Sequence, residues 1–180
     1  MAKALVVIAD GIEEMETVII TDILTRGGIE VTLASVADQQ VVAARGLKLL
    51  ADVTLSEVQD LSFDMIVCPG GLPGAKNLRD SALLTGLLEK QNRQQQWLAA
   101  ICASPAFVLA HHGLLEGRRA TCYPGCEEML PEHVGEDVVV DGHIITSQGP
   151  GTAMAFALKL VEVLAGDITA KEVASQALID

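Results

Sequence analysis

Cys102 is the residue whose type and position most directly indicate chemistry. It follows a predicted strand at 97–101 and precedes Ser104-Pro105 and an apolar segment with helical character. A thiol at such a turn lies near a helix N-terminus, where the helix dipole and free N–H groups stabilise a thiolate. The alternative is a packing residue, since free Cys is among the most buried residue types. The strand–Cys–small–Ser–Pro arrangement favours a reactive thiol, and we take Cys102 as the functional centre.

The turn Pro69-Gly70-Gly71, after a predicted strand at 64–68, is a second element of the predicted site. Glycines let a backbone turn sharply and approach a ligand closely. The amides of Gly70 and Gly71, together with the N–H of Ala103, would then stabilise an oxyanion formed next to Cys102. An ordinary tight turn is the alternative for this segment.

Three carboxylates, Glu13, Glu14 and Glu16, lie where the first strand gives way to its helix. Acidic residues in a first helical turn are commonly solvated and favoured by the helix dipole. One of them would instead point inward, where a protonated carboxyl can donate a hydrogen bond to a thiolate and act as an acid or base. The helical periodicity does not select which of the three.

The other cysteines and the histidines do not form a metal-ligand pattern. Cys122 and Cys126 are four positions apart, no C-x-x-C occurs, and the histidines lack ligand spacing. We therefore predict no metal and no cofactor. With no secretory context, a disulfide framework is not expected either. His111 and His112 lie well along the helix after Cys102, so no Cys–His pair is apparent.

Strand and helix patterns alternate along the chain with no linker and no internal repeat, which predicts a single α/β domain over residues 1–180. Half of the residues are hydrophobic but only 3% are aromatic. Such an aliphatic core suits a mostly parallel sheet between helix layers. The predicted strands are 3–9, 29–35, 64–68 and 97–101, the hairpins 41–50 and 138–146, and the helices 15–24, 81–94, 107–115, 152–165 and about 169–178.

This fold class predicts where the site lies. Parallel sheets between helices place their sites beyond the carboxyl ends of the strands. Segments 10–16, 68–72 and 102–105 each follow a predicted strand. We therefore expect the carboxylates, the glycine turn and Cys102 to meet at one edge of the sheet.

Composition argues against several classes of function. The net charge of -12 repels the phosphates of nucleic acids. The pair Arg118-Arg119 is the nearest to a basic cluster, and such a pair is typical of a solvated turn. No apolar stretch is long enough for a signal peptide or a bilayer span. We expect a soluble, cytoplasmic protein with no nucleic-acid or membrane partner.

Four separated motifs resemble the ThiJ/PfpI superfamily, and within it the branch of the parkinsonism-associated protein DJ-one and bacterial YajL. The motifs are Ala-Asp-Gly-Ile-Glu-Glu-Met-Glu-Thr at 9–17, Val-Cys-Pro-Gly-Gly at 67–71, Ala-Ala-Ile-Cys-Ala-Ser-Pro at 99–105 and Thr-Ser-Gln-Gly-Pro-Gly-Thr at 146–152. They occur in the family's order, and the resemblance extends from residue 3 to about residue 176.

The resemblance implies a flavodoxin-like three-layer sandwich and a homodimer. It implies that Cys102 is the nucleophile at a strained elbow, and it selects Glu16 as the inward-facing carboxyl partner. Gly71 and Ala103 match the positions whose amides face the thiolate.

Two other residues match family positions, and a third differs from the usual residue. Arg26 and Arg45 match basic positions near the family's dimer interface, and plain surface charge is the alternative for both. Ser104 stands where this branch usually has Gly, so the elbow is expected to differ slightly.

Two departures from the family pattern concern the thiol itself. Ala103 follows Cys102 where the protease-like branch has a His, which argues against a Cys–His peptidase. Tyr123 stands where DJ-one has a His that faces the thiol. Its neighbours Cys122 and Cys126 are then within reach of Cys102. They are either packing residues or thiols that resolve a sulfenic acid as a disulfide.

The resemblance implies a cysteine-dependent stress-response protein. Family members are assigned glutathione-independent glyoxalase activity, which converts methylglyoxal to lactate, and protein deglycation. The expected partners are therefore small reactive aldehydes or glycated groups. The alternative is a redox sensor or redox-regulated chaperone in which Cys102 is oxidised to sulfinic acid under oxidative stress. A structural dimer with an idle site is a third hypothesis.

Overall fold

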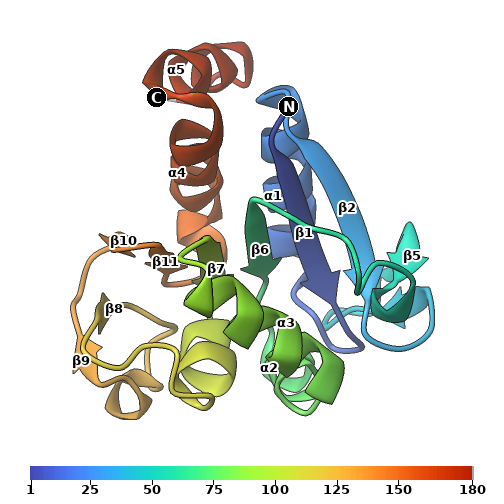
Figure 1. The fold of residues 1–180 in the computed structure, drawn as a ribbon. Coiled ribbons are helices and arrows are strands. Elements are labelled where there is room, and N and C mark those ends of the chain that lie inside the picture. The colour runs from blue at the N-terminus through green and yellow to red at the C-terminus, as the bar shows by residue number, and fades with distance from the viewer. Residues whose placement is uncertain (180) are drawn as a thin grey trace.

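A twisted seven-stranded sheet runs through the computed structural model, which describes residues 1–179 (Figure 1). The strand order is β10-β11-β7-β6-β1-β2-β5, and each neighbouring pair is parallel except β10 with β11. The strands are β1 (Lys3–Ile8), β2 (Glu30–Ser35), β5 (Val53–Thr54), β6 (Met65–Cys68), β7 (Trp97–Ile101), β10 (Val138–Asp141) and β11 (Ile144–Ser147).

Helices cover both faces of this sheet. Helices α1 and α4 pack side by side on one face, with α5 against α4, while α2, α3 and η2 lie on the other (Figure 1). The helices are α1 (Glu14–Arg26), α2 (Leu72–Arg79), α3 (Ala82–Arg93), η2 (Pro105–Ala110), α4 (Ala153–Ala165) and α5 (Asp167–Gln176). This arrangement confirms the predicted three-layer α/β sandwich with a mostly parallel sheet.

The central strands are buried because they are covered on both sides. Residues 4–8 of β1 and all four residues of β6 are buried, and nearly all of them are aliphatic. Sequences of this kind suit parallel strands between helix layers, where no side of the strand meets water. No helix within residues 1–179 combines the length and the apolar character that a membrane crossing requires.

Several short elements lie outside the main sheet. The predicted hairpin at 41–50 is confirmed as β3 (Gln40–Val42) and β4 (Lys48–Leu50). A second small pair, β8 (Arg119–Ala120) with β9 (Glu132–His133), was not predicted, and neither were α2 and β5. Single-turn helices complete the chain at η1 (Leu55–Glu57), η3 (Glu127–Met129) and η4 (Pro150–Thr152).

The helix predicted at 107–115 is wrong in its extent and type. A π-helical segment, η2, spans Pro105–Ala110, and residues 111–117 form turns. The N–H groups of His111 and Leu114 donate to Ala106 and Leu109, five residues back rather than four. Gly113 then adopts a positive φ of 70°, which ends any regular helix. Apolar content alone does not distinguish this segment from an α-helix.

Core packing between the helices and the sheet sets the stability of the fold. Leu160 of α4 is fully buried, so Leu160→Ala leaves a cavity and is expected to lower the free energy of unfolding by about 2–5 kcal/mol. Ile168 of α5 is 75% exposed, and Ile168→Ala is expected to change it by less than about 0.5 kcal/mol. Urea denaturation of both variants checks this, and equal losses would contradict the placement of α4.

Candidate active site

Cys102 lies in a strained turn directly after β7. Its φ is 66°, a left-handed backbone conformation that residues other than Gly rarely adopt. Two backbone hydrogen bonds hold it there. The Cys102 N–H donates to the carbonyl of Ser147 at 3.0 Å, and its own carbonyl accepts from the N–H of Tyr123 at 2.7 Å. The side chain is 7% exposed, so the thiol is close to the surface without being open to bulk water.

Glu16 is a fully buried carboxyl group beside this thiol. It projects from the first turn of α1, and its Oε2 accepts a 2.6 Å hydrogen bond from the N–H of Gly70. Its Oε1 has no hydrogen-bond partner among the described residues. An incompletely satisfied buried carboxyl is unusual and costly, which is typical of a group kept for chemistry. Of the three glutamates at this turn, the structure places Glu16 against the sulfur.

The backbone at Gly70 and Gly71 lies too close to neighbouring atoms to carry a side chain. A Cβ on Gly70 would lie 2.4 Å from the Cβ of Cys102 and 2.8 Å from Oε2 of Glu16. Gly71 has a φ of 85°, and a Cβ there would lie 2.5 Å from the carbonyl oxygen of Gly11. The Gly70 carbonyl also accepts from the N–H of Glu13 at 2.9 Å. Only glycine therefore fits at both positions, since the thiol, the carboxyl and a neighbouring loop occupy the space.

The ionisation of Glu16 is shifted strongly. Burial raises its pKa to about 7, although the hydrogen bond from Gly70 and the interaction with the Cys102 thiol both lower it. Near neutral pH the Glu16 carboxyl therefore exists in both its protonated and its ionised form.

Burial is the main influence on the ionisation of the Cys102 thiol. Burial, and then the charge of Glu16, raise the pKa of its thiol to about 12, while the amides of Gly71 and Ala103 lower it. The segment η2 is a short π-helical turn, so a helix dipole alone does not overcome burial. The negative charge of Glu16 therefore disfavours a thiolate at Cys102.

A cavity of about 390 Å³ opens beside the sulfur. Its lining combines residues from six segments of the chain, among them Gly71 and Ala103, whose amides are predicted to bind an oxyanion. The lining residues are Glu13, Ala44, Arg45, Gly71, Leu72, Pro73, Cys102, Ala103, Tyr123, Cys126 and Pro150. The volume is within the range of small-molecule sites, and the mixture of apolar and charged residues suits a small polar substrate.

The other residues that the family resemblance indicated lie either at the cavity or away from it. Arg45, Tyr123 and Cys126 line the cavity. Cys122 is buried and does not line it. Arg26 lies at the far end of α1, where its Nε donates to Asp22 at 2.7 Å.

The β3–β4 hairpin brings Arg45 to the site, and no sequence motif predicted this. Its backbone is held across the turn after β1, since the N–H of Ala44 donates to Ile12 at 2.7 Å and that of Arg45 donates to the carboxylate of Glu14. Ser104 is also explained, because its hydroxyl donates to the carbonyl of Pro69. Leu72 and Pro73 were missed as lining residues, although their position directly after Gly71 was a usable signal.

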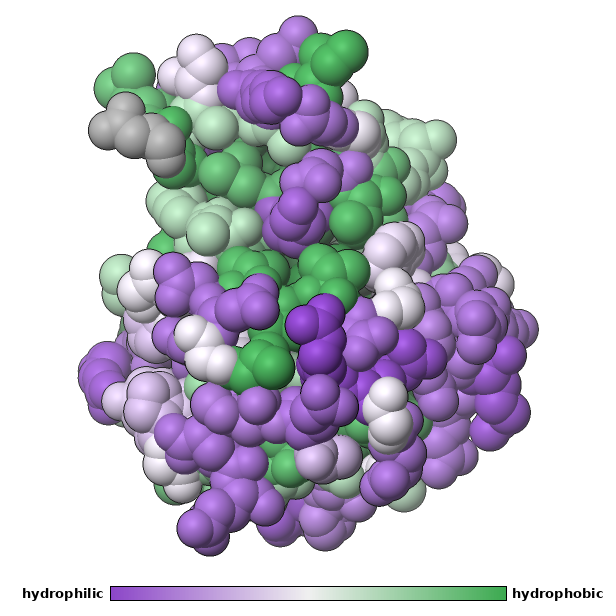
Figure 2. Space-filling view, turned by 90° about the vertical axis from the view of Figure 1, so that its left-hand side faces the viewer, coloured by the Kyte–Doolittle hydropathy of each residue, from purple (hydrophilic) through white to green (hydrophobic). Residues whose placement is uncertain are grey.

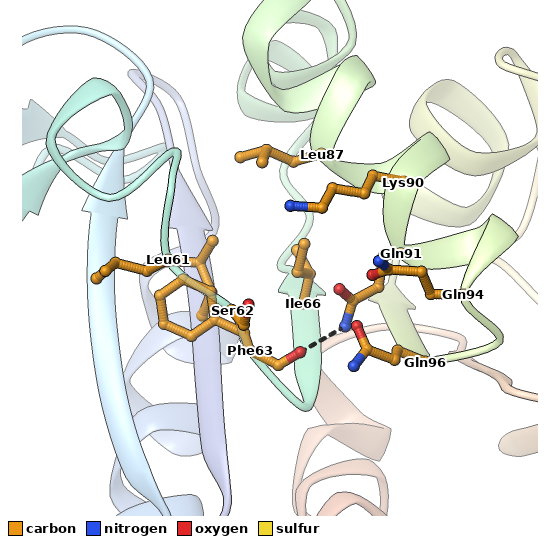
Figure 3. Close-up of a pocket in the computed structure, with 10 residues that line it drawn as sticks. Leu61, Ser62, Phe63, Ile66, Leu87, Lys90, Gln91, Gln94 and Gln96 are labelled. Carbon is orange, nitrogen blue, oxygen red and sulfur yellow. Dashed lines mark hydrogen bonds between the residues drawn. The ribbon is translucent and has the colours of Figure 1, made fainter.

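A second, smaller cavity lies at the opposite edge of the sheet and is not a candidate site. It is about 20 Å³, enough for one water, between α3 and the segment before β6. Figure 3 shows Gln91 across it from Phe63, and the Gln91 amide donates to the Phe63 carbonyl at 3.0 Å. Gln91 here satisfies a buried backbone group, which is a structural role.

Comparison with known proteins shows the family of this chain. The model of the DJ-1/PfpI family matches residues 2–163. The chain belongs to the DJ-1/PfpI family. Its sheet order and helix layers are those of the flavodoxin-like fold of that family. A structure of oxidized DJ-1 from Toxoplasma gondii superposes with a TM-score of 0.98 at 44% identity, covering 99% of both chains.

Relatives in the DJ-1/PfpI family differ in length. Protein DJ-1 homolog B of Arabidopsis thaliana is 45% identical over 95% of this chain, but the match spans only 40% of that protein. The glutathione-independent glyoxalase DJR-1.2 of Caenorhabditis elegans is 38% identical over 86% of this chain and 83% of its own length. The chain thus spans less than half of the Arabidopsis protein and most of the nematode one.

The crowding at Gly70 gives a test of the site geometry. Gly70→Ala places a methyl group against the Cys102 side chain and the Glu16 carboxyl, and overpacking of this kind costs about 1–3 kcal/mol. Gly86→Ala in α3 is the control, because no described atom lies within 4 Å of its Cβ. Thermal unfolding should show a loss for Gly70→Ala and no loss for Gly86→Ala. Unchanged stability in both would refute the packing of Glu16 against Cys102.

The raised pKa of Glu16 gives a pH dependence of stability with a definite sign. The folded carboxyl holds its proton up to about pH 7, whereas the unfolded one releases it near 4.5. The folded state thus binds more protons between these values, so its stability is full below pH 4.5 and declines as pH rises to 7.

Glu16→Gln removes this titration while keeping the side chain's size. Between pH 4.5 and 7, wild type should lose up to about 3 kcal/mol of unfolding free energy relative to Glu16→Gln. Denaturant titrations at a series of pH values measure the difference. A constant difference across this range would show that Glu16 is ionised in the folded protein throughout.

Proposed function

We propose that this protein is a glutathione-independent glyoxalase that converts methylglyoxal to lactate through the thiolate of Cys102. The observation that carries the proposal is a buried carboxyl, Glu16, placed behind a strained cysteine that opens onto a small cavity. Nucleophile, proton carrier and backbone amides lie together there, which is the set that addition to a carbonyl requires.

The proposed reaction begins with one proton shared between two groups. Burial disfavours two negative charges at one site, so Glu16 and Cys102 hold a single charge between them near neutral pH. When the proton is on Glu16, the carboxyl donates to the sulfur, and the amides of Gly71 and Ala103 stabilise the thiolate. This arrangement is the reactive one.

The thiolate of Cys102 then attacks the aldehyde carbon of methylglyoxal. The sulfur–carbon bond forms, and the carbonyl electrons move to the oxygen, which the amides of Gly71 and Ala103 bind. Proton transfer from the first to the second carbon, carried by Glu16, gives a lactoyl thioester. Water cleaves the thioester, which releases lactate and restores the thiol. The sum of these steps is methylglyoxal plus water giving lactate, with no external oxidant or cofactor.

The relatives support this chemistry. The nematode protein that is 38% identical is named a glutathione-independent glyoxalase, and the match covers most of both chains. Protein deglycation would use the same sulfur, since Cys102 would form a sulfur–carbon bond to the carbonyl-derived carbon of a glycated group while the carbon–nitrogen bond breaks and releases the amine. Because Ala103 follows Cys102 and no histidine is among the described residues that line the cavity, the site does not support a Cys–His peptidase mechanism.

A second candidate function is redox sensing, as a redox-regulated chaperone under oxidative stress. One observation favours it, since Oε1 of Glu16 has no hydrogen-bond partner among the described residues. A protonated Oε1 would donate to an oxygen of Cys102 sulfinic acid and stabilise that oxidation state. The similar Toxoplasma protein was solved in an oxidized form.

We further propose a cytoplasmic homodimer as the working form. All four cysteines are free, as is usual in a reducing compartment. Apolar residues of α1 and of the β3–β4 hairpin are well exposed, among them Met15, Val18, Leu47 and Leu50. Hydrophobic side chains also gather in a band over the face that carries α4 (Figure 2). Exposed apolar patches of this kind favour contact with a second copy.

Turnover of methylglyoxal tests the proposed function directly. Cys102→Ala should form no lactate above the uncatalysed level, because the nucleophile is absent. Glu16→Leu should lower kcat by about 10²–10⁴-fold, since the proton carrier is lost. Cys122→Ser is the matched control, because Cys122 does not line the cavity, and it should form lactate at the wild-type rate. Lactate formation by Cys102→Ala at the wild-type rate would overturn the proposal.

A further inference from the structure

The cavity beside Cys102 contains a second thiol that the proposed reaction does not use. Cys126 lines the same cavity as Cys102, from the loop between β8 and β9. The two residues therefore border a common space, although they belong to different loops. Cys68 and Cys122 do not line this cavity, so the pairing is specific to one of the three other cysteines.

Both cysteines are tied to one residue. Tyr123 donates its N–H to the carbonyl of Cys102 at 2.7 Å, and its own carbonyl accepts from the N–H of Cys126 at 3.1 Å. The residues between Tyr123 and Cys126 are Pro124 and Gly125, the latter with a φ of 96°, which is typical of a tight turn. This turn keeps Cys126 next to the active-site strand.

The turn that carries Cys126 lies at the surface. Tyr123, Pro124 and Gly125 are exposed, and no described atom lies within 4 Å of where a Cβ on Gly125 would be. The two Cα atoms of a disulfide are usually about 4.4–6.8 Å apart. A disulfide between Cys102 and Cys126 would therefore form with this exposed turn closed over the cavity.

The two thiols differ in the groups that surround them. Burial and the neighbouring carboxylate of Glu127 raise the pKa of Cys126, and Cys126 has no proton-carrying partner like Glu16. Burial raises the pKa of the Cys102 thiol as well, so the two thiols are distinguished by their neighbours. Cys102 lies beside the buried carboxyl of Glu16 and the amides of Gly71 and Ala103, which makes it the first target for an oxidant in this scheme.

We propose that Cys126 is the resolving cysteine of a peroxide-driven disulfide switch at Cys102. The Cys102 thiolate attacks a peroxide, takes up one oxygen as sulfenic acid and breaks the O–O bond. The Cys126 sulfur then attacks the Cys102 sulfur, forms the S–S bond and displaces the oxygen as water. Two thiols are oxidised in total, and one hydrogen peroxide is reduced to two waters.

The disulfide would have two consequences for the protein. It blocks the nucleophile and so stops carbonyl chemistry while peroxide is present. It also protects Cys102 from further oxidation to sulfinic acid, which thiol reductants do not reverse. The inference rests on the reactivity of Cys102 that the proposed function also needs, but not on any particular carbonyl substrate.

Peptide mapping without reduction, after mild hydrogen peroxide treatment of the full chain, tests the switch. We expect a Cys102–Cys126 cross-linked peptide in wild type, lost on addition of dithiothreitol with recovery of both thiols. In Cys126→Ser, Cys102 should instead gain two oxygens. Cys122→Ser is the matched control, since it removes a neighbouring cysteine outside the cavity and should keep the cross-link.

Several results would overturn the inference. They are equal amounts of sulfinic acid at Cys102 in wild type and Cys126→Ser, a cross-link from Cys102 to Cys122, and a cross-link between two chains. Lactate formation by the reduced wild-type protein is measured in parallel. Lactate formation without the cross-link would reject the disulfide switch and support the glyoxalase activity. The cross-link without lactate formation would support the switch and reject the glyoxalase activity.

Discussion

The site depends on one buried carboxyl group that has too few hydrogen bonds. Glu16 reaches from α1 to the carboxyl edge of the sheet, where a single amide, that of Gly70, binds it. A charge there is poorly solvated, so the carboxyl keeps its proton to about pH 7 beside the thiol of Cys102. The absence of a side chain at position 70 and the left-handed backbone at 102 both follow from fitting these groups together.

The strand order explains why three distant segments meet. In the sheet, β1, β6 and β7 are neighbours, although β2 follows β1 in the sequence. The turns after these three strands therefore lie side by side at one edge. They are also tied together, because Glu13 donates to the carbonyl of Gly70 and Ser104 donates to that of Pro69. The order of the strands thus brings the three turns together, and hydrogen bonds between the turns hold them in place.

The two proposals place both kinds of chemistry on a single sulfur. Attack on an aldehyde and attack on a peroxide would both require the thiolate of Cys102, beside Glu16 and the amides of Gly71 and Ala103. The two proposed reactions would therefore compete for Cys102. A resolving thiol at Cys126 would change the outcome of that competition, because it would turn a lasting oxidation into a reversible one.

The sequence by itself determined the architecture and the position of Cys102 directly after a strand. Aliphatic strands alternating with helices predicted the sandwich, because each pattern has one way to bury its apolar face. The strand-to-helix position of Cys102 and the glycines after β6 were local features, and they were visible without any contact information. The hairpin β3–β4 was equally local.

Tertiary structure decided what depends on packing between distant segments. Residue chemistry alone left Glu13, Glu14 and Glu16 equivalent, since only contact with Gly70 and Cys102 distinguishes the third, which the family resemblance had to select. The helix after Cys102 became π-helical, because five-residue hydrogen bonds satisfy its backbone and Gly113 ends it. The ionisation of Cys102 was also a tertiary property, since burial acts on a thiol more strongly than one short helical turn.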